Sequence, residues 1–135
     1  MAASILVVED NPDSIGLIDY LLRAYGYAPA LATNGRTGVR RALVGRPDLI
    51  LLDVGMAEMD GYQVLAAVRG QPGLESTPIV AVTASVTRHD HERIVAAGFE
   101  GCIDKPIDPE SFVAQVEHYL PPALRADGDE GEERG

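Results

Sequence analysis

The chain has 135 residues, 46% of them hydrophobic, and its 21 acidic against 11 basic residues give a net charge of −10. This length and apolar content predict one domain with a substantial core. Because no basic patch could neutralise phosphates, we expect no nucleic-acid partner. No apolar run is long enough to span a bilayer, so we expect no membrane partner. The single cysteine, Cys102, excludes an intrachain disulfide, which favours the cytoplasm.

Five short apolar segments have the character of strands. Three contain an uninterrupted run of apolar residues: 4–8, 49–53, where the run ends at Asp53, and 78–82. Such runs are typical of strands buried on both faces of a parallel sheet. Two are weaker: 27–32 contains a proline, and 101–104 starts with a glycine. A proline cannot donate to a ladder of hydrogen bonds, so we expect the weaker pair at the edges of the sheet.

Helical patterns follow the strands. Asn11 and Pro12 provide an N-cap and a first-turn proline for a helix that stops at Gly26. We expect further helices after residue 35, from residue 61, over 88–97 and from about 108 to 120.

Five strands that alternate with five helices predict an α/β fold, a doubly wound parallel sheet with helices on both faces. With the weak strands at the edges, the strand order is 2-1-3-4-5, as in flavodoxin-like folds. We assign residues 1–120 to this domain and 121–135 to an acidic, disordered tail.

Polar residues stand where four of the expected strands end. Glu9 and Asp10 follow the first strand, Asp53 ends the third, Thr83 follows the fourth, and Lys105 follows the fifth. In the predicted order these four strands are neighbours, so their carboxyl ends open into one crevice, where such folds bind ligands.

This set of side chains predicts a particular chemistry. Three close carboxylates repel one another unless a cation bridges them, and Mg²⁺ fits a site with few protein ligands and no twelve-residue calcium loop. Lys105 adds a positive charge, and Thr83 adds a hydroxyl donor. Together they can bind the oxygens of a phosphoryl group, for which Asp53 would be the nucleophile.

The chain resembles the receiver domains of response regulators in two-component signalling. The resemblance covers residues 4–120, and it rests on 6–11, 51–53 with 59–61, 79–84 and 104–107. It implies that Glu9 and Asp10 hold Mg²⁺ with Asp53, and that the carbonyl of Gly55 is a further metal ligand. It also implies a cis peptide bond between Lys105 and Pro106.

For function, the resemblance implies that Asp53 accepts a phosphoryl group from a histidine kinase or a histidine phosphotransfer protein, in a self-catalysed reaction followed by autodephosphorylation. Thr83 and Lys105 would contact the phosphoryl oxygens. A receiver with no output domain would act as a stand-alone regulator or within a phosphorelay, binding partners through helix 88–97, the fifth strand and the last helix. Small residues at Gly55 and Ser85 favour a short-lived phosphoryl group.

Two positions depart from the family pattern. Ala57 stands where the family often has proline, which should loosen the turn after Asp53. Cys102 stands where the family usually carries a tyrosine or phenylalanine whose rotamer reports phosphorylation, and we expect it to be a small buried hydrophobe. His89 and His91 point to different faces of one helix, so we do not expect them to bind a metal together.

Two other functions remain open. The chain could be a phosphorylation-independent interaction module with a vestigial site, although the complete set of polar residues at the strand ends argues against this. It could also be a flavin- or nucleotide-binding protein of the same fold. No glycine-rich phosphate loop follows the first strand, which disfavours that alternative.

Overall fold

The computed structural model describes residues 3–84 and 87–125. Its five strands are β1 (Ile5–Val8), β2 (Ala30–Ala32), β3 (Leu49–Asp53), β4 (Ile79–Thr83) and β5 (Gly101–Asp104). The α-helices are α1 (Pro12–Ala24), α2 (Gly35–Gly45), α3 (Gly61–Arg69), α4 (Arg88–Ala97) and α5 (Phe112–Glu117). All strand pairs are parallel, and the order is β2-β1-β3-β4-β5, which confirms the predicted fold.

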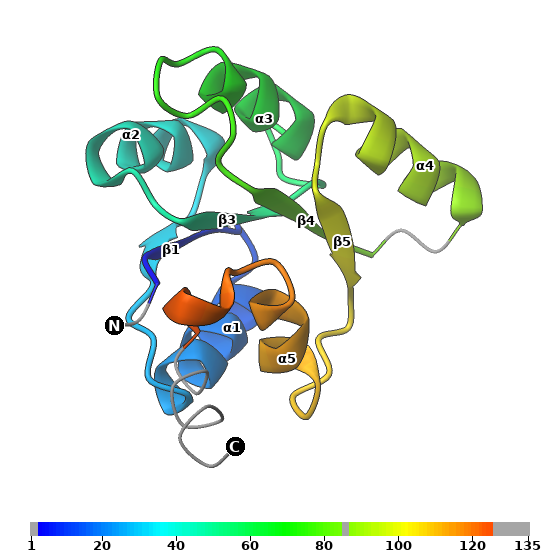
Figure 1. The fold of residues 1–135 in the computed structure, drawn as a ribbon. Coiled ribbons are helices and arrows are strands. Elements are labelled where there is room, and N and C mark those ends of the chain that lie inside the picture. Colours follow the sequence, from blue (N-terminus) through cyan, green and yellow to red (C-terminus); the bar gives the residue numbers. More distant parts are fainter. Residues whose placement is uncertain (1–2, 85–86, 126–135) are drawn as a thin grey trace.

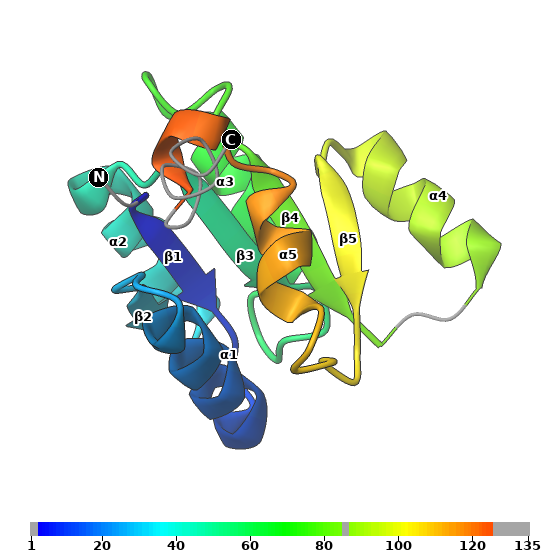
Figure 2. The ribbon, with the colours of Figure 1, turned by 60° about the horizontal axis from the view of Figure 1, so that its bottom comes forward.

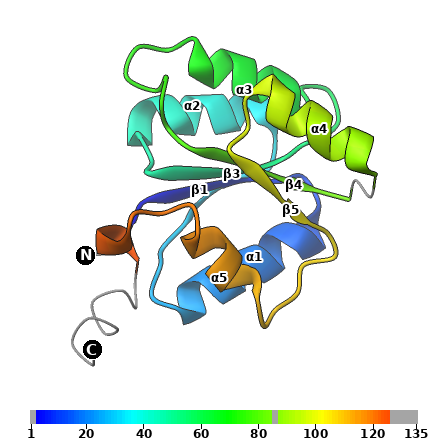
Figure 3. The ribbon, with the colours of Figure 1, turned by 45° about the vertical axis from the view of Figure 1, so that its right-hand side comes forward.

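The helices form a layer on each side of the sheet. Helices α1 and α5 cover one face, and α2, α3 and α4 cover the other (Figures 1 and 3). Alternate residues of β3 face opposite layers: Leu49 and Leu51 belong to the apolar cluster under α1 and α5, whereas Ile50 and Leu52 belong to the cluster under α2 and α3. Burial on both faces explains why the central strands are continuous apolar runs.

The strands direct their carboxyl ends to one edge of the sheet, as the arrowheads of β1 and β5 show in Figure 2. Side chains cap the starts of α1 and α3 at this edge, as they also cap α2 and α4. Asn11 Oδ1 accepts hydrogen bonds from the amides of Asp13 and Ser14 at the start of α1. Asp60 and Gln63 form a reciprocal capping box at the start of α3. These caps fix where the chain turns from strand to helix.

The second strand is shorter than the predicted 27–32. It starts only at Ala30, because the amide of Tyr27 donates to Leu22 O at the end of α1, and Pro29 has no amide hydrogen to pair. Tyr27 is nevertheless buried, with its hydroxyl 2.6 Å from Glu117 Oε2.

The last helix is also shorter than expected. It begins at Phe112, because Asp108 holds residues 108–111 in a turn by accepting hydrogen bonds from the Ser111 hydroxyl and the Glu110 amide. Tyr119, which follows this helix, is half-buried.

The first part of the expected tail has a defined structure. A short 3-10 helix, η1 (Pro122–Leu124), follows α5, and the amide of Ala3 donates to Leu124 O over 3.1 Å. Residues 126–135 of the expected tail lie outside the described part of the chain. Among the helices that the structure describes, none combines the length and apolar character needed to cross a membrane.

Candidate functional site

The predicted site residues lie where the chain leaves four neighbouring strands. Glu9 and Asp10 follow β1, Asp53 and Thr83 are the last residues of β3 and β4, and Lys105 follows β5. Glu9, Asp53 and Thr83 are buried, with 1%, 7% and 7% of their surface exposed, while Asp10 is exposed. Polar side chains that are buried at the end of a sheet need partners there.

The three carboxylates form one cluster. One oxygen from each of Glu9, Asp10 and Asp53 can be chosen so that all three lie within 4.8 Å of one another. The strand register explains the approach, since Val8 pairs with Leu52 and the two chain ends therefore emerge side by side. The cluster predicted from the sequence is present.

Backbone amides hold each of these carboxylates. Asn11 N donates to Glu9 Oε2 over 3.0 Å, and Gly55 N donates to Asp53 Oδ1 over 3.0 Å. Ala57 N donates to Asp10 Oδ2 over 3.2 Å. A proline at position 57 could not make that contact, so the departure from the family pattern supplies a tie between the loop after β3 and Asp10. The sequence reasoning missed these three donors.

Lys105 places one ammonium group between two carboxylates. Its Nζ lies 2.8 Å from Glu9 Oε1 and 3.7 Å from Asp53 Oδ2. The chain is held here by the amide of Lys105, which donates to Thr83 O over 2.8 Å, and the Lys105–Pro106 bond is cis, as expected. The closer partner of the lysine is therefore Glu9 and not Asp53.

The electrostatics of the cluster favour an added positive charge. Burial raises the pKa of Glu9 above its usual value and contact with Asp53 adds to the rise, while Lys105 and the Asn11 amide oppose it. Without a cation, Glu9 is therefore harder to ionise than a carboxyl group in water.

The residues present fit a divalent cation. Glu9 Oε1 is buried and accepts no well-aligned hydrogen bond, although Lys105 Nζ lies 2.8 Å away. Carboxylate oxygens are the ligands that Mg²⁺ prefers in proteins, and Glu9, Asp10 and Asp53 could provide them. Gly55, the remaining residue implied as a ligand, follows Asp53 by two positions and is tied to it by the hydrogen bond from its amide.

The loop after β3 is shaped by a close approach. A Cβ atom at Gly61 would lie 2.7 Å from Val54 Cα and 2.8 Å from Asp53 O, so only glycine lets α3 start against the end of β3. Glu58, in the same loop, adopts a left-handed backbone with φ of 62°. The position of Asp53 thus depends on how tightly this loop folds back.

The structure changes the expectation for two residues on β5 and α4. Cys102 is half-buried and not a fully buried hydrophobe. His91 has a partner on the neighbouring strand, because its Nε2 lies 3.1 Å from Asp104 Oδ1. Helix periodicity predicted that His89 and His91 face different ways, but it could not show which strand residue His91 would meet.

A flavodoxin-like sheet whose strand ends carry a buried aspartate, two further carboxylates, a threonine and a lysine defines the receiver class of signalling domains. The sequence profile of the response regulator receiver domain matches residues 5–117. This chain belongs to that family.

Relatives of known identity support the same conclusion. The chain is 36% identical over 120 residues to the polar-differentiation response regulator DivK of Brucella anthropi, and the match covers 89% of this chain and 98% of that protein. Its structure is similar to the chemotaxis response regulator CheY4 of Vibrio cholerae, with a TM-score of 0.84, 29% identity, and coverage of 89% of this chain and 100% of that one.

A further similar structure contains a metal. The receiver domain of a sensor histidine kinase from Pseudomonas aeruginosa PAO1 has a magnesium ion coordinated in its active-site cleft. Its TM-score with this chain is 0.80 at 32% identity, covering 88% of this chain and 98% of that domain.

Proposed function

We propose that this chain is a single-domain response regulator that accepts a phosphoryl group on Asp53 from the phosphohistidine of a histidine kinase or phosphotransfer protein. The observation that carries the proposal is the burial of Asp53 beside Lys105 and two further carboxylates at the end of β3. Coverage of 98% of the DivK relative and 100% of CheY4 supports the single-domain role.

In the proposed reaction an Asp53 carboxylate oxygen attacks phosphorus. A phosphorus–oxygen bond forms as the phosphorus–nitrogen bond breaks, and the departing imidazole keeps the electron pair and takes up a proton. Lys105 contributes positive charge near the phosphoryl oxygens, and Thr83 contributes a hydroxyl group at the end of the neighbouring strand. Bound Mg²⁺, held by Glu9, Asp10, Asp53 and Gly55, would neutralise phosphoryl charge.

The chain would promote its own phosphorylation and its own dephosphorylation, and would not act on other substrates. The exposed Gly55 leaves access for water, which favours a short-lived phosphoryl group. Ser85, the other residue on which this expectation rests, lies outside the described residues.

The signal would pass to another protein through α4, β5 and α5. Phosphorylation adds nearly two negative charges at the edge that carries Thr83 and Lys105. With Cys102 in place of an aromatic residue, no large ring can move between exposed and buried positions on β5. We expect backbone movement in residues 84–97 to carry the change to the partner.

The test of this function is covalent labelling. Incubation with acetyl phosphate and Mg²⁺ should add one phosphoryl group by mass, whereas Asp53→Asn or excess chelator should prevent it. Asp13→Asn, which changes an exposed aspartate in the first turn of α1, is the matched control and should label fully. Full labelling of Asp53→Asn would contradict the assignment, and no labelling of the wild type would favour a phosphorylation-independent module.

A further inference from the structure

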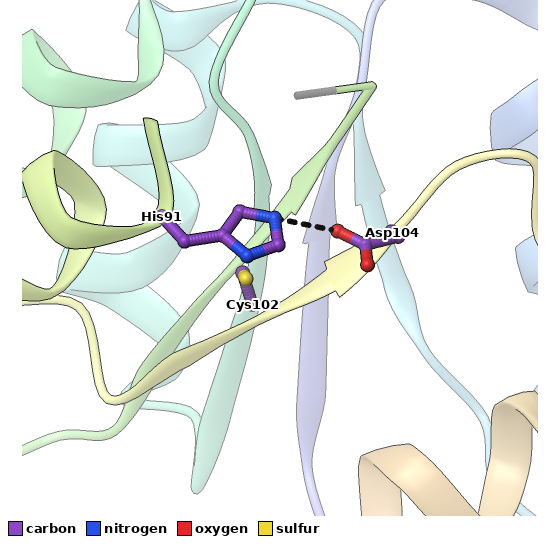
Figure 4. A group of neighbouring side chains, drawn as sticks. All are labelled: His91, Cys102 and Asp104. Atoms are coloured by element: carbon purple, nitrogen blue, oxygen red, sulfur yellow. Dashed lines mark hydrogen bonds and ion pairs between the residues drawn. The ribbon is translucent and has the colours of Figure 1, made fainter. Parts of the chain in front are cut away.

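A second group of metal-ligating side chains lies between α4 and β5. His91 comes from α4, and Cys102 and Asp104 come from β5 (Figure 4). Residues two apart on a strand point to the same face, so the thiol and the carboxylate both face the helix. One ligand atom from each of the three residues lies within 4.8 Å of the others.

The geometry is close to that of a tetrahedral metal site. Two ligands that each lie about 2.0–2.1 Å from a zinc ion are about 3.3 Å apart at the tetrahedral angle. His91 Nε2 and Asp104 Oδ1 are 3.1 Å apart, which is nearly this separation. A sulfur ligand would lie about 3.6 Å from the nitrogen or oxygen. The Cys102 sulfur lies within 4.8 Å of one His91 ring nitrogen and one Asp104 oxygen, so each of these separations exceeds that value by at most about 1.2 Å.

We propose that His91, Cys102 and Asp104 form a binding site for Zn²⁺, with the fourth coordination position open to water or to a ligand from a partner protein. Imidazole and thiolate ligands select zinc over magnesium and calcium, which prefer oxygen ligands throughout. The site is therefore chemically distinct from the carboxylate cluster at Asp53.

An ion can reach the site from solvent. The side chains of His91 and Asp104 are 38% and 61% exposed, and Cys102 is half-buried beside them. Burial, together with the charge of Asp104, raises the pKa of the Cys102 thiol, so the metal-free protein keeps this thiol protonated. On coordination the thiol proton passes to solvent, and the thiolate becomes the metal ligand.

A bound ion would tie α4 to β5. Among these three residues the structure records the His91–Asp104 pair, and exposed pairs of this kind stabilise a structure only weakly. Asp104 immediately precedes Lys105, whose ammonium contacts Glu9 and Asp53. Zinc would thus restrain the surface through which the proposed signal leaves the domain.

Cobalt provides a direct test, because Co²⁺ substitutes for Zn²⁺ and a thiolate–cobalt bond gives a near-ultraviolet charge-transfer band. Cys102 is the only cysteine in the chain, so such a band can come from no other residue. The tag-free, reduced full chain should develop the band with one equivalent of Co²⁺, and Zn²⁺ should displace it. Asp53→Asn should behave as the wild type, which separates this site from the phosphorylation site.

Variants test the ligand set. His91→Ala and Cys102→Ser should each weaken Zn²⁺ affinity in a competition titration by at least about tenfold, since even indirect partners of metal ligands contribute that much. His89→Ala, which removes an exposed histidine from the same helix, is the matched control and should bind as the wild type. Circular dichroism of each variant checks its fold.

Hydrogen exchange gives a readout that does not depend on the thiol. Zn²⁺ should slow amide exchange across residues 87–97 in the wild type, and this protection should be absent in His91→Ala. The proposal is overturned if Co²⁺ produces no charge-transfer band in the wild type. It is also overturned if the band persists unchanged in folded His91→Ala.

Discussion

Gly61 offers a sharp test of how the loop at Asp53 is built. It is the first residue of α3, and its amide donates to Val54 O over 3.2 Å. In Gly61→Ala the new Cβ would lie 2.7 Å from Val54 Cα, whereas ordinary van der Waals contact begins at 3.4 Å. The start of α3 must therefore move away from Val54 by about 0.7 Å, the difference between these distances. The atoms in the way are backbone and cannot rotate aside.

The expected cost follows from this overlap. Forcing a methyl group into a packed site costs about 1–3 kcal/mol, and weakening the Gly61–Val54 hydrogen bond adds about 1 kcal/mol. The better helix propensity of alanine returns up to about 1 kcal/mol. We therefore expect Gly61→Ala to lower the free energy of unfolding by about 1–3 kcal/mol, which shifts a urea midpoint by about 1 M.

Gly16→Ala is the matched control. Gly16 lies inside α1, is exposed, and has nothing within 4 Å of the position its Cβ would take. The same substitution there should raise the free energy of unfolding by about 0.5–1 kcal/mol, because it removes the extra backbone freedom that glycine has in the unfolded chain and creates no clash. Urea denaturation followed by circular dichroism measures both. Equal stability of the two variants would refute the reasoning about the loop.

Two further predictions concern the carboxylate cluster. Asp10→Asn should weaken Mg²⁺ binding and the labelling of Asp53. In chelator its melting temperature should stay the same or rise, because the substitution relieves repulsion between carboxylates and leaves Asn11, the cap of α1, in place. A lower melting temperature would show a structural role for Asp10. The raised pKa of Glu9 means that its stabilising contribution is full below the usual value of 4.5 and is lost as pH rises through the folded value. Glu9→Gln lacks this loss, so in chelator its stability relative to the wild type should increase from about pH 4 to about pH 7, and a flat difference would contradict the shift.

Much of the fold follows from local patterns in the sequence. The runs at β1, β3 and β4 are apolar at every position before the terminal aspartate or threonine, and such runs are stable only inside a sheet covered on both faces. Pro29 and Gly101 indicated that β2 and β5 are the edge strands. The starts of β2 and α5 were misplaced because they depend on hydrogen bonds from Tyr27 and to Asp108, which local patterns do not predict.

The candidate site was predictable for a related reason. Parallel strands end at one edge, so the sequence alone determined that Glu9, Asp10, Asp53, Thr83 and Lys105 lie near one another. It could not determine that Lys105 approaches Glu9 more closely than Asp53, because that depends on side-chain packing at the rim.

Contacts between separate elements were decided by the tertiary structure alone. His91 and Asp104 are 13 residues apart, and they meet because α4 packs across β5 in one particular rotation. The Ala57 amide reaches Asp10 only because the loop after β3 folds back over the end of β1. Periodicity in a sequence fixes which face of an element is apolar, but the partner that each polar residue meets depends on how the elements pack together.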